Sequence, residues 1–283
     1  MVKVAIAGVG ELAQELIRIL LEGGRHEVTA LPRKESPGNH PPGLRWCKIG
    51  YYNKQQLTQT LRGFDVVLSF ILVFSDEAYQ AQLNLIDAVV QAGVKRFAPS
   101  EWSVFEYCLF TPGIFMDYLS PPEKLSERNL SHSGLFIDFD KCRAVLPEKM
   151  DAVVSFTAID DFAAIVSEAL EYKDEWPVIG GISGNKLTIS GLLQLGERIR
   201  GRGFTVETVK RHDLLLGKLG TWVPASLHSE IASNEQQLTM EQMTAHTLLA
   251  IADGHWNLTD EWSKLLPAHK FIDIGEFLEK AWL

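Results

Sequence analysis

The sequence predicts an α/β fold in which a doubly wound parallel sheet is joined to a smaller, mainly helical portion. In residues 2–100, strand-like apolar runs alternate with helical patterns, and this order favours parallel strands connected by helices. The longest strongly apolar run, residues 66–74, is too short for a membrane helix but suits a buried parallel strand. We therefore divide the chain into a core, residues 1–110, and a second portion, residues 111–283, that shares strands with it.

The elements each have a local signal. The helix predicted at residues 11–24 has an apolar side and a Gly-Gly stop, and residues 32–43 are rich in Pro and Gly and so predict a loop. In the second portion, residues 151–172 predict a strand and then a helix, residues 188–209 a capped helix and a strand, and residues 235–283 a mainly helical end. The core pattern predicts strands at 2–8, 26–32, 44–50, 64–71 and 94–100 and helices at 11–24, 53–63 and 76–93.

The composition restricts the function classes. The formal net charge is −9, and an acidic surface repels phosphate backbones, so we expect no nucleic-acid partner. The N-terminal segment turns polar at Glu11 before any apolar run of useful length, so we expect neither a signal peptide nor a membrane association. The three cysteines, Cys47, Cys108 and Cys142, lack zinc spacing and favour a reduced, cytoplasmic compartment.

A glycine pattern joins the first predicted strand to the first helix. The segment Gly8-Val9-Gly10-Glu11-Leu12-Ala13 has the form G-x-G-x-x-A. In this context Gly8 permits a tight turn, Gly10 lets a pyrophosphate approach the backbone, and Ala13 lets the helix pack close to the strand. The helix N-terminus also presents N–H groups and a partial positive charge to phosphates. The pattern predicts that residues 8–12 bind a dinucleotide, with a merely structural turn as the alternative.

The end of the second predicted strand indicates which dinucleotide is bound. An acidic residue there would bind the ribose 2′-hydroxyl of NAD, but this chain has Arg33 and Lys34 instead. Their position is the one a 2′-phosphate would take, so the sequence favours NADP(H). The alternative is a solvated basic pair on a loop.

Catalytic residues are not assigned by any local motif. Tyrosine is nowhere followed four residues later by lysine, and a G-x-S-x-G elbow is lacking. The histidines show no paired metal spacing, so we expect no metal.

Three segments together resemble a known family. The stretch LIDAVVQAGVKRFAPSEW resembles the signature segment of NmrA-like proteins and their isoflavone-reductase-like relatives, an atypical short-chain dehydrogenase group. The stretches FTPGIFMDYL and LLPAHKFIDIGEFLEKAWL look like the fungal branch of that family. The usual glycine loop of the family, G-x-x-G-x-x-G, has the relaxed form Ala7, Gly10 and Ala13 here.

The resemblance implies a Rossmann-type domain that binds NADPH, with Arg33 on the 2′-phosphate. It also implies a substrate side formed by residues 112–119, in which Phe115, Met116 and Tyr118 are the candidate contacts. Enzymes of the family reduce small aromatic or enone-type molecules, whereas other members sense the nucleotide and act through a protein partner. Along the cofactor the resemblance places Ser69, Phe70 and Ile71 and, beside the nicotinamide, Pro99, Ser100 and Glu101.

The connection after the fifth predicted strand is unusually short. Residues 99–103 alone precede the next apolar run, residues 104–110, whereas a crossover between parallel strands takes a dozen or more residues. We therefore predict that the crossover helix is missing. Residues 104–110 should then pair irregularly, run antiparallel or leave an exposed apolar edge.

The resemblance places the essential lysine of the reductases on this missing helix, so no catalytic lysine is carried over. Lys124 and Lys141 are available, but surface positions are the better prediction for both. Three hypotheses about the protein remain: it is an NADPH-dependent reductase, a non-catalytic NADP(H)-sensing regulator, or the product of an alternative transcript. The expected partner is a small aromatic substrate or another protein, and a homodimer is a further candidate.

Overall fold

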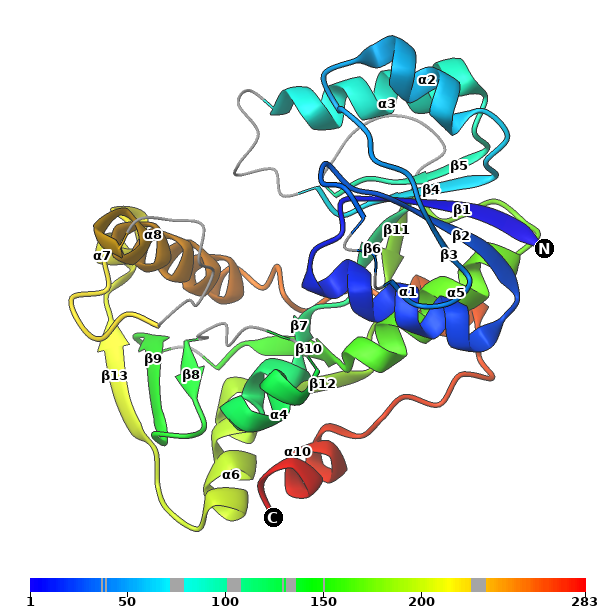
Figure 1. The fold of residues 1–283 in the computed structure, drawn as a ribbon. Helices are drawn as coiled ribbons and strands as arrows, with labels where there is room; N and C mark the ends of the chain where they lie inside the picture. The colour runs from blue at the N-terminus through cyan, green and yellow to red at the C-terminus, as the bar shows by residue number, and fades with distance from the viewer. Residues whose placement is uncertain are drawn as a thin grey trace. The chain divides into compact units, whose positions relative to one another are not determined.

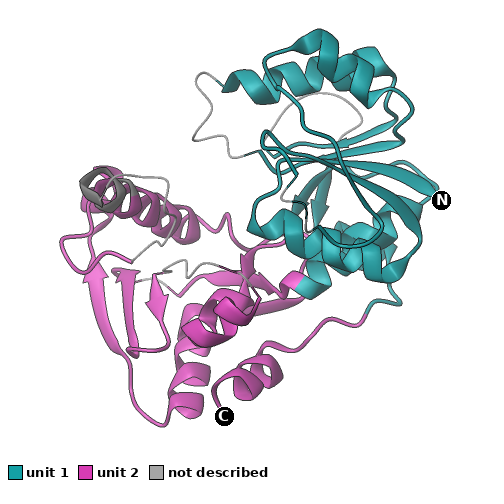
Figure 2. Cartoon of the chain, viewed as in Figure 1, with its two compact units in different colours: residues 1–111, 160–181, 260–269 teal, residues 112–159, 182–259, 270–283 magenta. Residues whose placement is uncertain are grey.

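The computed structural model describes residues 1–36, 38, 40–71, 79–100, 108–128, 130, 136–149, 151–224 and 233–283. The chain forms two compact units, each assembled from segments that are distant in sequence (Figure 2). All of the predicted core lies in unit 1, together with two later segments, and the predicted boundary at residue 110 stays a prediction. Unit 1 comprises Met1–Thr111, Asp160–Gly181 and Asp260–His269, and unit 2 comprises Pro112–Ile159, Ile182–Thr259 and Lys270–Leu283.

Unit 1 contains a five-stranded parallel sheet in the order β3-β2-β1-β4-β5. Helices α2 and α3 lie on one face of this sheet and α1 and α5 on the other (Figure 1). The predicted doubly wound α/β fold is therefore confirmed. The elements of the sheet and its helices are β1 Val2–Ala7, α1 Glu11–Gly23, β2 His26–Leu31, β3 Leu44–Trp46, α2 Lys54–Leu61, β4 Val66–Ser69, α3 Gln80–Ala92, β5 Arg96–Ala98 and α5 Ile159–Glu171.

These elements form where the sequence pattern places them, with ends a few residues shorter than predicted. Helix α1 ends at Gly24, which has left-handed backbone angles, and α3 ends in the same way at Gly93. Strand β1 is central in the sheet, and its residues 4–7 are fully buried. A strand covered on both faces is apolar throughout, which explains the continuous apolar run.

Two further strands of unit 1 form a separate sheet. Strand β6, Leu109–Thr111, pairs in parallel with β11, Ile179–Gly181, and the backbone N–H of Leu109 donates to the carbonyl of Val178. No local signal predicts this pairing, because the partner strand lies some seventy positions along the chain. Residues 101–107 lie outside the described residues, so the predicted absence of a crossover helix stays a prediction.

An aromatic cluster packs beside this small sheet. The ring of Phe110 stacks on Trp262 of α9, Glu261–Leu265, at 5.3 Å between centroids, and Trp176 meets both rings edge-on. The indole N–H of Trp262 donates to Sγ of Cys108 at 3.1 Å. Burial raises the pKa of the Cys108 thiol to about 12, so this cysteine stays protonated and is a packing residue rather than a nucleophile.

Unit 2 contains helices and two three-stranded sheets, and its bounds differ from those of the predicted second portion, residues 111–283. The strand orders of the two sheets are β12-β10-β7 and β13-β9-β8. The buried core lies between these sheets and the helices of the unit. Its elements are β7 Ile114–Phe115, η3 Met116–Leu119, α4 Pro122–Glu127, β8 Ile137–Asp138, β9 Arg143–Pro147, β10 Val153–Thr157, β12 Asn185–Thr188, α6 Ile189–Arg200, β13 Thr205–Val209, α7 Arg211–Leu215, α8 Ser233–Ala252 and α10 Ile274–Trp282.

The capped helix predicted in residues 188–209 is α6. The hydroxyl oxygen of Thr188 accepts a hydrogen bond from the backbone N–H of Gly191 at 3.0 Å, which satisfies one N–H of the first turn. Within the described part of the chain, no helix has the length and apolar character needed to cross a membrane.

Candidate dinucleotide-binding site

The predicted cofactor residues lie at one edge of the sheet in unit 1. Ala7, the last residue of β1, pairs with Leu31 of β2 and with Ser69 of β4, and Leu68 of β4 pairs with Ala98 of β5. The segments that follow these four parallel strands therefore all emerge at the same carboxyl edge. In open α/β sheets, ligands bind outside this edge.

The strand order reverses between β1 and β4, and the glycine loop lies at that point. Gly8 has a φ of +82°, and a Cβ placed on it would come within 2.7 Å of the carbonyl oxygen of Phe70. The backbone N–H of Phe70 donates to the carbonyl of Ala7 at 2.7 Å. A side chain cannot be accommodated between these two backbones, so glycine is required at position 8.

A buried tyrosine, which the sequence analysis did not identify, fixes this loop. The hydroxyl of Tyr51 accepts a hydrogen bond from the N–H of Gly8 at 3.0 Å and donates one to the carbonyl of Leu31. Tyr51 is 3% exposed, and its burial raises the pKa of the phenol. Its carbonyl accepts a hydrogen bond from the amide of Asn84 on α3. No local motif identifies Tyr51, because its role depends on contacts with residues 20 and 43 positions away.

Gly10, unlike Gly8, lies beside open space. It is the N-cap residue of α1, it is exposed, and a Cβ placed on it would meet no atom within 4 Å. The first backbone hydrogen bond of the helix runs from the N–H of Gln14 to the carbonyl of Gly10. The N–H groups of the first turn therefore point out of the helix. Open space beside an N-terminal turn fits a pyrophosphate group.

The third position of the pattern also has the expected environment. Ala13 is 1% exposed, so the helix lies close to the sheet at this point. Val9, Glu11 and Leu12 are partly exposed. The carboxylate of Glu11 in the first turn adds a negative charge near the expected position of the pyrophosphate.

Arg33 and Lys34 follow β2 after Pro32, and both are exposed at the carboxyl edge. The positive charge of Arg33 acts to lower the pKa of Tyr51, against the larger effect of burial. The carbonyl of Lys34 accepts a hydrogen bond from the indole of Trp46 at 3.3 Å, so the turn that carries the two cations is attached to β3. This position agrees with the prediction that they reach a 2′-phosphate, which stays a prediction.

The other predicted cofactor residues follow β4 and β5. The hydroxyl of Ser69 donates to the amide oxygen of Gln82 at 2.8 Å and is buried, so its side chain serves packing. Phe70 and Ile71 are partly exposed, as are Pro99 and Ser100, whereas Glu101 lies outside the described residues. Contact of any of these residues with a cofactor stays a prediction.

The predicted substrate residues belong to unit 2. Phe115 and Tyr118 are partly exposed, and their rings meet edge-on at 6.5 Å, whereas Met116 is fully buried in the core of the unit. Between them, the buried carboxylate of Asp117 binds Arg128 at 2.8 Å and accepts a hydrogen bond from the N–H of Ile159. This ion pair fixes the segment in place.

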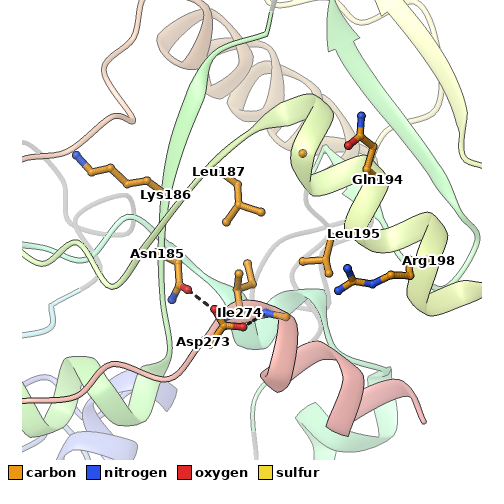
Figure 3. Close-up of a pocket in the computed structure, with 10 residues that line it drawn as sticks. Asn185, Lys186, Leu187, Gln194, Leu195, Arg198, Asp273 and Ile274 are labelled. Carbon is orange, nitrogen blue, oxygen red and sulfur yellow. Dashed lines mark hydrogen bonds between the residues drawn. The ribbon is translucent and has the colours of Figure 1, made fainter.

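Unit 2 also has a pocket of about 620 Å³ between β12, α6 and the start of α10 (Figure 3). Several of its polar groups already have partners within the protein. The side-chain amide of Asn185 donates to the carbonyl of Ile272 and accepts from the N–H of Ile274, Asp273 caps α10, and Arg198 binds Glu279. The pocket is not part of the sheet edge described above, and we assign it no ligand.

The strand order, the glycine loop and the basic residues after β2 define a Rossmann-type dinucleotide-binding protein. Residues 8–107 match the family model described as NAD(P)H-binding. The chain is 23% identical to Oxidoreductase swnN of Metarhizium robertsii, with 100% of this chain and 98% of that protein covered. It is 30% identical to Oxidoreductase BOA1 of Botryotinia fuckeliana over 55% of each chain.

Solved structures share the fold over nearly the whole chain. AtPrR2 with NADP+ and (+)-pinoresinol has a TM-score of 0.64 at 18% identity, covering 99% of this chain and 98% of that one. The NADPH-dependent quinone oxidoreductase QOR2 of Escherichia coli, complexed with NADPH, has a TM-score of 0.66 at 15% identity, covering 98% and 99%. Residues 8–107 thus match an NAD(P)H-binding domain, and the chain shares the fold of these reductase structures, in agreement with the resemblance stated above.

Proposed function

We propose that this protein binds NADP(H) at the carboxyl edge of the unit 1 sheet and reduces a small aromatic or enone-type molecule. The observation that carries the proposal is the open backbone at Gly10, at the N-terminus of α1, with Arg33 and Lys34 at the end of the neighbouring strand. The bound cofactor would supply a hydride, and the chain would bind and orient it. The names of the fungal relatives, all oxidoreductases, support this reaction class.

A second candidate function is that of an NADP(H)-sensing regulator that acts through a protein partner without turnover. Its support is the absence of lysine from residues 99–123 of the sequence, where the resemblance places the essential lysine of the reductases. Lys124 is half-exposed and lies 3.4 Å from Glu127, and Lys141 is exposed on a turn, so neither has the buried position expected of a catalytic lysine. For either function we place the protein in the cytoplasm.

The hydroxyl of Tyr51 contacts the glycine loop, but it is a poor proton donor. Its hydroxyl hydrogen is engaged by the carbonyl of Leu31, and burial raises the pKa of the phenol. We therefore assign Tyr51 to positioning the loop, and the proton donor stays unassigned.

The experiment is a titration of the protein with NADPH and NADH at low and moderate salt. A charge-assisted contact with phosphate contributes about 1.5–3 kcal/mol, so NADPH should bind at least about tenfold more tightly. Arg33→Ala should remove most of that preference. The matched control is Arg45→Ala, since Arg45 is an exposed arginine within β3. Equal affinities for the two cofactors, or an unchanged preference in Arg33→Ala, would contradict the proposal.

A further inference from the structure

A carboxylate lies in the basic turn that follows β2. The turn carries Arg33 and Lys34, and Glu35 comes directly after them in the chain. An uncompensated carboxylate at this position would repel a 2′-phosphate, and it could instead accept a hydrogen bond from the ribose 2′-hydroxyl of NAD. The turn therefore contains groups suited to either dinucleotide, and the preference depends on how the charge of Glu35 is compensated.

The structure pairs Glu35 with a lysine of the segment that follows β3. Lys48 Nζ lies 2.6 Å from Oε1 of Glu35, which is the distance of a charge-assisted hydrogen bond. The side chain of Lys48 is 51% exposed and that of Glu35 78% exposed. An ion pair this exposed adds little to the stability of the fold. Its consequence is local, because it compensates the one negative charge within the turn.

The segment that carries Lys48 is attached to the basic turn on both sides of this lysine. The backbone N–H of Ile49 donates to the carbonyl of Pro32 at 2.9 Å. The indole N–H of Trp46 donates to the carbonyl of Lys34 at 3.3 Å. These hydrogen bonds hold the two backbones together independently of the ion pair. The ammonium group of Lys48 is therefore kept within reach of the turn.

We propose that Lys48 is a positioning residue that sets the cofactor preference by holding the carboxylate of Glu35 and compensating its charge. The inference rests on the proposed function, because it concerns the NADP(H) preference of the same sheet edge. With the ion pair formed, the positive charges of Arg33 and Lys34 act on a 2′-phosphate without opposition. Without Lys48, the carboxylate of Glu35 repels that phosphate and is available to a ribose 2′-hydroxyl, so the preference shifts toward NADH.

A double-mutant cycle on Glu35 and Lys48 tests the inference. The measured quantity is the dissociation constant of NADH divided by that of NADPH, obtained by calorimetric titration at low salt, because salt screens exposed charges. Lys48→Met should lower this ratio at least about threefold, the effect of one exposed charge pair. Glu35→Gln alone should not lower the ratio. The double variant, with Lys48→Met and Glu35→Gln, should restore the wild-type ratio.

Two further variants separate specificity from structure. Lys48→Arg keeps a cation within reach of Glu35 and should retain the wild-type ratio. Lys95→Met is the matched control, because Lys95 Nζ lies 3.7 Å from Asp65 and both residues directly precede strands, at the opposite, amino edge of the sheet. This variant should leave the ratio unchanged. If Lys48 were merely structural, Lys48→Met would weaken the binding of both cofactors alike and would not change the ratio.

The possible outcomes distinguish this inference from the proposed function. A wild-type protein without a preference for NADPH would contradict the proposed function, and the inference with it. A wild-type protein that prefers NADPH, with an unchanged ratio in Lys48→Met, would overturn the inference alone. A lowered ratio that persists in the double variant would also overturn it, because Lys48 would then act on the phosphate through its own charge and not through Glu35.

Discussion

At Gly8 the backbone has a φ of +82° and lies against the carbonyl of Phe70, whereas a Cβ on Gly10 would extend into open space. The two glycines of the loop therefore serve different physical purposes: Gly8 lets two strand ends meet, and Gly10 leaves the backbone surface open. Tyr51 supports the first of these by joining Gly8 to the end of β2. A substitution at each position should consequently affect a different measurable quantity.

Gly10→Val should abolish NADPH binding and leave the fold intact. The added side chain would fill the space that the pyrophosphate needs, while meeting no atom of the protein. Calorimetric titration with NADPH measures the first effect and thermal unfolding the second. Gly8→Ala is the matched comparison, and it should lower the free energy of unfolding by about 1–3 kcal/mol, because alanine is strained at this φ and its Cβ would overlap Phe70. Normal NADPH binding by Gly10→Val would show that the loop is only structural.

At the scale of elements, helix α5 contacts two histidines in different environments. His269 Nε2 lies 3.0 Å from Asp161 and its Nδ1 lies 3.8 Å from Glu168, and the hydrogen bond and charge of Asp161 raise the pKa of His269. Near the other end of the helix, the side chain of His26 is 1% exposed, 3.8 Å from Glu171, and burial lowers its pKa. The two histidines should give opposite contributions to the pH dependence of stability.

His269→Gln should destabilise the protein at low pH more than at high pH. Because the folded pKa of His269 is raised, the stability it contributes is fully present below the unfolded value of about 6.5 and is lost as the pH rises through the folded value. Denaturant unfolding of both proteins at about pH 5.5 and about pH 8.5 measures this. We expect a difference of about 1–2 kcal/mol at the lower pH. A difference that is equal at both pH values would mean that His269 is held by packing alone.

His26→Phe should reduce the loss of stability on acidification. The folded pKa of His26 is lowered, so the unfolded chain binds a proton more readily, and the wild-type protein loses stability as the pH falls below about 6.5. Phenylalanine fills a similar volume without a titrating group. Unfolding free energies of the two proteins should diverge between about pH 7 and about pH 5 in favour of the variant. If the two curves stay parallel, protonation of His26 is not coupled to unfolding.

The sequence predicted most elements of the central sheet because their signals are local. The Gly93 stop and the Thr188 cap each depend on neighbours within a few residues. The pairing of β6 with β11 was not predicted, since it joins strands of three residues that lie far apart in sequence. In the candidate site, the positions of the glycine loop and of Arg33 could be predicted from where they follow the first and second strands in the sequence. Tyr51 could not, because its hydrogen bonds are set by the tertiary fold.

At the scale of the whole molecule, the chain passes between the two units five times. The glycine loop and its supporting contacts lie entirely within unit 1, whereas the predicted substrate residues and both Lys124 and Lys141 lie in unit 2. The sheet edge predicted to bind the cofactor therefore belongs to one unit. The proposed reduction would require a proton donor in addition, and the sequence from Pro99 to Pro112 contains no lysine that could serve as one.

We therefore expect NADPH binding without efficient turnover. Without a lysine near the nicotinamide, proton transfer would lack the roughly 10²–10⁴-fold acceleration of general acid–base catalysis. The measurement is NADPH oxidation against a panel of aromatic enones and ethers, with binding of NADPH confirmed in the same preparation. Beside it, a version with a lysine-bearing helix of about a dozen residues inserted after Trp102 would restore the length of a normal crossover, and it should oxidise NADPH faster than the chain as it stands. Rapid turnover by the unmodified chain would contradict the prediction. If that turnover persisted in Lys124→Ala and in Lys141→Ala, the proton donor would be neither of these two lysines.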